Sequence, residues 1–178
     1  MPVLHAIRDA RDEDALEIIE LIGSVFGEYT GCVMDVDGEM PELRRIASSF
    51  REHDGQFWVA ERDGRIVGMG GFSQTSPPSP LSLKGEGEEK ERERDRGVEL
   101  KKLYVHRRER KTGLGGALVD RIEAAARERN ARRIELWSDT RFTTAHAFYE
   151  RRGYVRGGTR ELHDLSKTVE FHFTKVLS

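Results

Sequence analysis

Cysteine, proline and long apolar runs are all scarce in this chain of 178 residues. The single cysteine, Cys32, rules out a disulfide within the chain, which suits a reducing compartment. No stretch approaches the roughly 20 consecutive apolar residues of a membrane-spanning helix, and the first residues lack the basic and apolar regions of a signal peptide. We therefore expect a cytoplasmic protein with no membrane partner.

An excess of charge of one sign is also missing. Basic residues number 30 and acidic residues 32, so the formal net charge is −2. This balance offers no general attraction for nucleic acid, although the arginines between Arg107 and Arg133 leave a nucleic-acid-binding module as an alternative. The six histidines lack the spacing of a zinc site, so we expect no metal.

What the sequence does contain is an alternation of strand and helix patterns. Apolar alternation predicts strands over 5–8, 97–106, 132–138 and 168–177, with 153–157 as a further short candidate. A hairpin that turns at Asp63 and Gly64 is predicted over 57–72. Helical spacing predicts a helix capped by Asp12, a second over 114–126, and a third over 142–154 that Gly153 ends. Residues 27–56 show no clear pattern.

Residues 75–97 interrupt this alternation. The segment holds three of the five prolines, and eleven of the thirteen residues over 84–96 are charged. Such a composition cannot bury a core, so we predict one domain over 1–178 that carries a disordered charged insertion at 75–97. A charged helix is the alternative for the second half of the insertion.

The strand over 97–106 changes its apolar side halfway along. Val98 and Leu100 share one side of a regular strand, whereas Leu103 and Val105 share the other. A β-bulge between the two pairs would return all four to one side, and bulges often lie beside active sites. Exposure at a sheet edge would explain the pattern almost as well.

A glycine-rich stretch follows this strand, with the sequence RRERKTGLGGALV. It is not a P-loop, because Lys111 and Thr112 precede Gly113 instead of following the last glycine. It is not a dinucleotide-binding fingerprint, because Leu118 occupies the position of the third glycine. A loop with little side-chain bulk that opens a helix still presents free N–H groups, which suit a pyrophosphate.

The pattern Arg110-x-x-Gly113-x-Gly115, between a strand and a helix, resembles the acyl-CoA pyrophosphate motif of the GNAT superfamily of N-acetyltransferases. The later stretch AHAFYERRGY resembles a second motif of that superfamily, although Phe142 stands where an asparagine is common. The resemblance implies an α/β (α+β) fold in which helices flank a mixed central sheet. It further implies a bulged central strand and splayed strands that hold the acyl-CoA.

The same resemblance implies acetyl-CoA as cosubstrate and places it against the bulged strand, the glycine loop and the later helix. The residues concerned are Leu103, Tyr104, Val105, Arg110, Lys111, Thr112, Gly113, Leu114, Gly115, Gly116, Ala145 and Phe148.

The implied reaction moves an acetyl group from sulfur to a primary amine. An alkylamine with a pKa of about 10.4 is protonated at neutral pH, so a base must remove a proton. Glu99 is our candidate base, and main-chain N–H groups near the bulge are candidate oxyanion donors. Tyr149 stands at the superfamily's position for the acid that protonates the leaving thiolate. The alternatives are a solvated Glu99 paired with a lysine and a core Tyr149.

The acceptor is less defined. An acidic run from Glu28 to Glu42 would favour a cationic amine, and Glu28 and Tyr29 are candidate acceptor-binding residues, although a solvated acidic loop fits as well. We expect a small amine or amino acid as acceptor and a monomer or homodimer. The alternatives are acetylation of a protein N-terminus or lysine, and a non-catalytic acyl-CoA-binding module.

Overall fold

The architecture comes from a computed structural model that describes residues 4–75 and 96–178. The charged insertion predicted at 75–97 therefore lies outside the described residues, apart from its ends.

The described chain forms a seven-stranded mixed sheet. The spatial order is β1 (Ala6–Asp9), β2 (Gln56–Arg62), β3 (Arg65–Gln74), β4 (Gly97–Val105), β5 (Arg133–Asp139), β7 (Val169–Val176) and β6 (Val155–Glu161). Only β4 and β5 are paired in parallel, and every other neighbouring pair is antiparallel. This arrangement confirms the mixed sheet that the sequence predicts.

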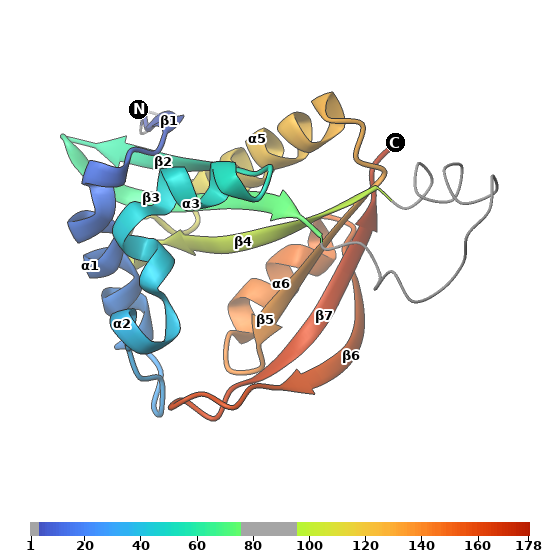
Figure 1. Cartoon of the computed structure of the whole chain (residues 1–178). Coiled ribbons are helices and arrows are strands. Elements are labelled where there is room, and N and C mark those ends of the chain that lie inside the picture. Colours follow the sequence, from blue (N-terminus) through green and yellow to red (C-terminus); the bar gives the residue numbers. More distant parts are fainter. Residues whose placement is uncertain (1–3, 76–95) are drawn as a thin grey trace.

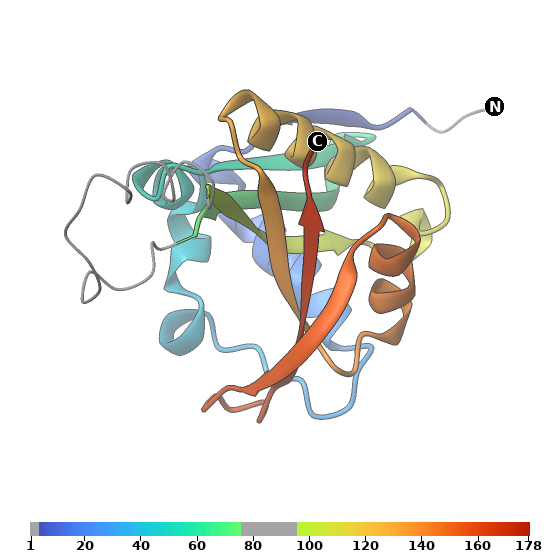
Figure 2. The same ribbon diagram turned by 90° about the vertical axis from the view of Figure 1, so that its right-hand side faces the viewer.

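Helices cover both faces of the sheet (Figures 1 and 2). One face carries α1 (Ala15–Phe26), the short α2 (Val36–Glu39) and α3 (Ile46–Glu52), with 3₁₀ turns at η1 (Asp12–Asp14) and η2 (Pro41–Arg45). The other face carries α5 (Leu114–Glu128) and α6 (Thr143–Arg151), and a third 3₁₀ turn, η3 (Arg107–Glu109), follows β4. Each face consequently has its own apolar core.

The two cores explain why the helices are amphipathic. The apolar side of α1, including Ile18 and Ile22, packs with Leu43 of η2 against Val59 and Met69 of the sheet. On the other face, α5 buries Leu114, Leu118 and Ile122 against β3 to β5, together with Phe173 of β7 and Tyr149 of α6. At about 1.5–3 kcal/mol for each large side chain removed from water, these cores fix the positions of the strands.

The predicted bulge in β4 is confirmed. Met69 pairs with Tyr104 and Gly71 pairs with Lys101, so β4 contains one residue more than β3 over this interval. Lys102 has a φ of 55°, and Leu103 lies beyond it on the same core face as Leu100. The extra residue therefore restores the apolar side of the strand, as the sequence pattern requires.

The hairpin turn is also confirmed, because Asp63 and Gly64 have φ values of 52° and 74°. The expected cap at Asp12 is wrong: its carboxylate accepts hydrogen bonds from the main chain and hydroxyl of Ser48, while α1 begins after Asp14. The unassigned stretch contains α2, η2 and α3, and the short strand candidate becomes the full β6. Among the described residues, no helix is both long and apolar enough to cross a membrane.

Candidate functional site

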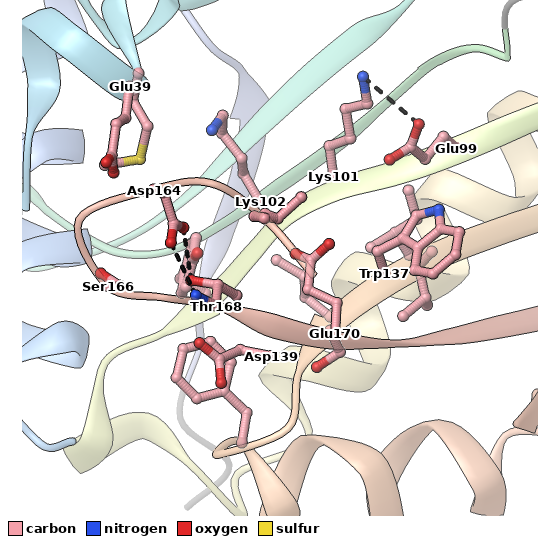
Figure 3. A pocket seen from close by; sticks show the side chains of 18 of the residues that line it. Glu39, Glu99, Lys101, Lys102, Trp137, Asp139, Asp164, Ser166, Thr168 and Glu170 are labelled. Atoms are coloured by element: carbon pink, nitrogen blue, oxygen red, sulfur yellow. Dashed lines mark hydrogen bonds and ion pairs between the residues drawn. The ribbon is translucent and has the colours of Figure 1, made fainter. Parts of the chain in front are cut away.

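The central strands β4 and β5 are paired at one end only. Their pairing runs from Gly97 with Arg133 to Glu99 with Glu135, and beyond these residues the strands separate. β4 and β5 are direct neighbours in the sheet, so no strand of the described chain lies between them where they separate. A cavity of about 700 Å³, which we name the interstrand cavity, lies where they diverge (Figure 3).

The cavity is walled by side chains from segments far apart in the sequence. Its described lining includes Phe26, Cys32, Val33, Glu39, Glu42, Glu99, Lys101, Lys102, Leu103, Tyr104, Trp137, Asp139, Phe142, Ala145, Tyr149, Asp164, Ser166 and Glu170. Both predicted catalytic residues, Glu99 and Tyr149, are among them. The fold thus brings together two side chains that lie 50 positions apart in the chain.

Tyr149 stands on the inner side of α6 and is only 5% exposed. Its ring packs against Phe173 and Tyr154, while its hydroxyl has no hydrogen-bond partner in the described part of the chain. Burial raises the pKa of the Tyr149 phenol, and the neighbouring Tyr104 adds to the increase. The phenol therefore holds its proton at neutral pH and faces the cavity as a donor without an acceptor.

Glu99 lies at the last paired position of β4, at the closed end of the gap. Its side chain is 24% exposed, and its carboxylate stands 3.7 Å from the Lys101 ammonium, too far for a hydrogen bond. Glu135 is its register partner on β5, and Ser73 is its register partner on β3. Among the described residues, this ion pair with Lys101 is the contact recorded for the Glu99 carboxylate, and no hydrogen bond fixes it.

The glycine loop, which we define as Lys111–Gly116, follows η3 and includes the first three residues of α5. Its first half, residues 111–113, is exposed, whereas Leu114 is buried. Lys111 and Gly113 have φ values of 64° and 89°, so the backbone turns through the left-handed region twice before the helix begins. No main-chain N–H from Lys111 through Gly116 donates to an acceptor within the described residues. A Cβ placed on Gly113 would meet no atom within 4 Å, so the space above the loop is open.

This geometry fits the pyrophosphate of acetyl-CoA. Free N–H groups and the positive end of the α5 dipole point to the same open space. Phe148 lies 3.6 Å from a Cβ built on Gly115, so α6 borders the loop at this point. Leu103 and Tyr104 line the cavity, whereas Val105 lies beside Gly115.

Arg110 has a partner that the sequence did not indicate. Its guanidinium donates to both carboxylate oxygens of Glu28, at 2.6 and 2.9 Å, and to the Val105 carbonyl at 3.2 Å. Glu28 is not among the residues that line the cavity, and the Tyr29 ring packs against the Phe142 ring, tilted by 54°, at a centroid distance of 4.7 Å. Neither acceptor-binding candidate therefore lines the cavity: Tyr29 contacts the lining residue Phe142, and Glu28 is engaged by Arg110.

Most of the acidic run is engaged in contacts within the protein. Asp35 caps α2, Asp37 pairs with Arg44, and Glu42 pairs with Lys102 at 2.8 Å. The run therefore does not form a free anionic surface.

Two loops meet over the cavity, as the lower parts of Figures 1 and 2 show. The Val33 N–H donates to the Ser166 hydroxyl at 2.8 Å, and the Leu165 N–H donates to Glu39 at 2.7 Å. These bonds join the segment after α1 to the β6–β7 loop, and we name them the loop bridge. The bridge closes one side of the interstrand cavity.

Comparison with known proteins assigns the family. A family model described as the GNAT family of acetyltransferases matches residues 20–154.

This chain belongs to the GNAT family.

Solved GNAT structures share its fold. An acetyltransferase from Staphylococcus aureus Mu50 superposes with a TM-score of 0.77 at 21% identity, over 98% of this chain and 100% of that one. A ribosomal-protein-alanine N-acetyltransferase from Brucella melitensis superposes with a TM-score of 0.68 at 20% identity, over 97% and 99%. At such identities the likeness shows the fold alone. A search of curated proteins finds no match.

Several polar residues of this GNAT cavity had no role in the sequence analysis. Asp139 ends β5 and is held by the Arg141 guanidinium, and Glu170 begins β7 and accepts a hydrogen bond from Arg160 at 2.8 Å. Burial raises the pKa of Tyr104, and both carboxylates, which line the same cavity, add to the increase. Only the position of Asp139 and Glu170 at strand ends, opposite the part of β4 that has separated from β5, could have indicated that these two residues belong to the site.

Proposed function

We propose that this GNAT protein transfers an acetyl group from acetyl-CoA to the primary amine of a small molecule or amino acid. The observation that carries the proposal is that the buried Tyr149, whose hydroxyl has no hydrogen-bond partner among the described residues, lines the same cavity as Glu99. When bound, acetyl-CoA supplies the acetyl group on a sulfur leaving group. The glycine loop would hold its pyrophosphate, and the gap between β4 and β5 would admit its thioester end.

Glu99 and Tyr149 would each carry out one of the two proton transfers that the reaction requires. From the free amine, the nitrogen forms a C–N bond to the carbonyl carbon as the C–S bond breaks, so the nitrogen loses one proton and the sulfur gains one. An acceptor that arrives as an ammonium ion must first lose a further proton, which passes through the base to solvent. Glu99 accepts the amine proton, directly or through water, and Tyr149 donates a proton to the sulfur. Main-chain N–H groups of β4 beyond Glu99 have no β5 partner, so they supply donors for the carbonyl oxygen.

The loop bridge favours a small acceptor over a protein. A peptide crossing the cavity would have to pass between the segment at Val33 and the β6–β7 loop, which are hydrogen-bonded to each other. A small molecule needs no such passage and fits within about 700 Å³.

Release of free thiol from acetyl-CoA tests the proposal. A panel of small amines and amino acids should include acceptors that accelerate release, whereas peptides with free N-termini or lysines should not. Acceleration only by peptides would move the function to protein acetylation. Binding of acetyl-CoA without release under any acceptor would leave a non-catalytic binding module.

The pH profile tests Glu99 itself. Glu99→Gln should lose rate mainly near neutral pH and recover part of it at high pH, where free amine is abundant without a base. Glu135→Gln is the matched control, because Glu135 is the register partner of Glu99 but does not line the cavity. A Glu99→Gln profile that follows the wild type at every pH would remove Glu99 from the chemistry.

A further inference from the structure

Ser73 is a buried polar residue of the interstrand cavity that the proton transfers described above do not use. It lies near the end of β3, is 5% exposed and lines the cavity. Its hydroxyl forms no hydrogen bond with any residue of the described ranges 4–75 and 96–178. Burial of a hydroxyl costs free energy unless a hydrogen bond compensates it. The Ser73 hydroxyl is therefore available to a molecule that enters the cavity.

Ser73 and Glu99 stand side by side on one face of the sheet. They are register partners in the antiparallel pair of β3 and β4, so their Cβ atoms lie about 4.5–5.5 Å apart. Val98 and Leu100, which flank Glu99, pack in the core beside α5, and so does Phe72 next to Ser73. Because side chains alternate along a strand, Ser73 and Glu99 both point to the opposite face, toward α1 and α3.

The other described neighbours of Glu99 cannot take the place of Ser73. Lys101 carries an ammonium group, which donates hydrogen bonds but cannot accept one. Glu135, the register partner on β5, does not line the cavity and is in hydrogen-bond contact with His172 at 3.2 Å. A serine hydroxyl can accept a hydrogen bond and can donate its own proton to a carboxylate. Ser73 is therefore the neighbour that can accept an N–H beside Glu99.

We propose that Ser73 binds the acceptor nitrogen together with Glu99 and thereby makes the site selective for primary amines. A neutral primary amine has two N–H groups and one lone pair. With one N–H donated to Glu99 and the other to the Ser73 hydroxyl, the lone pair takes the remaining direction and attacks the thioester carbon. The proton bound to Glu99 then passes to that carboxylate, while the N–H bound to Ser73 stays on the amide product.

This role rests on the proposed acetyl transfer and adds an acceptor-binding residue to it. A secondary amine has a single N–H, so it can donate to Glu99 or to Ser73 but not to both. It either leaves the buried hydroxyl without a partner or loses contact with the base. The chemistry of the pair therefore predicts discrimination against N-methylated acceptors.

Matched acceptors and a matched pair of variants test this inference. Each primary amine that accelerates thiol release should be compared with its N-methyl derivative, and the wild type should favour the primary amine in kcat/KM by about tenfold or more. Ser73→Thr keeps the hydroxyl, whereas Ser73→Val has a methyl group of similar size in its place. The preference should persist in Ser73→Thr and be about 2- to 10-fold smaller in Ser73→Val, because one neutral hydrogen bond is lost.

Ser138→Ala is the control. Ser138 is 7% exposed and lines the cavity, but it shares its side of β5 with Ile134 and Leu136, which pack in the core beside α5, so the ratio should not change. Equal ratios in Ser73→Thr and Ser73→Val would overturn the role of Ser73 and leave the acetyl-transfer proposal standing. If either variant fails to fold, an unchanged ratio in Ser73→Ala would overturn it as well. No thiol release with any acceptor, despite measurable acetyl-CoA binding, would instead overturn the proposed function.

Discussion

The glycine loop and the interstrand cavity present different chemical groups to a ligand. The glycine loop offers main-chain N–H groups from one short run, Lys111–Gly116, whose conformation is set by two residues with positive φ. The cavity offers side chains that six or more separate elements bring together. A main-chain site depends on backbone shape and open space, whereas a side-chain site depends on individual functional groups. The two regions should therefore fail under different kinds of substitution.

The largest effect is expected where the two regions meet, at Tyr149. Tyr149→Phe keeps the ring packed against Phe173 but removes the donor, so kcat should fall by about 10²- to 10⁴-fold, the usual contribution of a positioned acid. Acetyl-CoA affinity, measured by calorimetry, should stay unchanged, because the glycine loop is untouched.

Tyr154→Phe provides the control for Tyr149→Phe. It deletes a buried hydroxyl that binds Glu123 at 3.0 Å and does not line the cavity, so it should affect stability and spare kcat. Normal turnover in Tyr149→Phe would mean that the thiolate leaves without this acid.

A charge placed in the glycine loop should come next. Gly115→Asp adds a Cβ that makes only ordinary contacts, the nearest at 3.6 Å, so the fold should tolerate it. Its carboxylate should weaken acetyl-CoA binding by roughly 10- to 100-fold, which corresponds to about 1.4–2.8 kcal/mol of repulsion. Gly115→Ala, which adds the same Cβ without charge, should bind nearly as the wild type. Equal affinities for the two variants would place the phosphates elsewhere.

The contacts of Glu109 that hold the start of the glycine loop should weaken at low pH. Glu109, 5% exposed, accepts hydrogen bonds from His5 at 2.8 Å and Arg62 at 2.7 Å, and its main-chain carbonyl accepts from Thr112. The hydrogen bond from His5, followed by that from Arg62, lowers the pKa of Glu109. A lowered pKa in the folded state means that Glu109 stabilises the fold above the unfolded-state pKa of about 4.3. That contribution is lost as the pH falls through the folded-state pKa.

Glu109→Gln should accordingly lower the free energy of unfolding by about 1–3 kcal/mol at pH 7, and its difference from the wild type should shrink below about pH 4. Urea titrations at several pH values measure this. Glu128→Gln, at the exposed end of α5, should show neither effect. A difference that stays constant with pH would mean that Glu109 acts through packing and not through its charge.

The smallest effect is expected at the loop bridge. Ser166→Ala removes the hydroxyl that joins the β6–β7 loop to Val33, and a neutral hydrogen bond contributes about 0.5–1.5 kcal/mol. The acceptor KM should rise by roughly 2- to 10-fold while the acetyl-CoA KM stays unchanged. Ser24→Ala, which removes a hydroxyl bonded within α1, is the control. A change confined to the acetyl-CoA KM would contradict a role for the bridge on the acceptor side.

The same contrast explains what could be predicted from the sequence. The bulge in β4 was predictable because the spacing of the apolar residues shows which side of the strand is buried, and this spacing changes halfway along. The residues are Val98, Leu100, Leu103 and Val105. The glycine loop was predictable because its residues are contiguous in the sequence. Small side chains just before a helix leave the N–H groups of its first turn accessible, and this can be inferred from the local sequence alone. Both features are encoded within a dozen residues.

The cavity was not predictable in this way, because its side chains meet only in the folded chain. Glu170 and Asp139 belong to strands whose order in the sheet differs from their order in the sequence. Glu28 belongs to an acidic run that suggested acceptor binding, yet it pairs with Arg110, which lies 82 positions further along the chain. Charge in a sequence window indicates how many ionisable groups are present, but not which ones the fold neutralises.

Because β4 and β5 are paired at one end only, a small rotation at that end changes the width of the gap most at the opposite end. The strands are joined at the Glu99–Glu135 end, where Val98 and Ile134 are packed in the core, and beyond it they pair only with β3 and β7 and no longer with each other. At about 3.3 Å per residue, Tyr104 lies roughly 16 Å beyond that joint, so a rotation of about 5° at the joint moves it by about 1.4 Å. Changes of one methyl group at Val98 or Ile134 can therefore alter the width of the gap, and with it the range of acceptors, without touching any substrate.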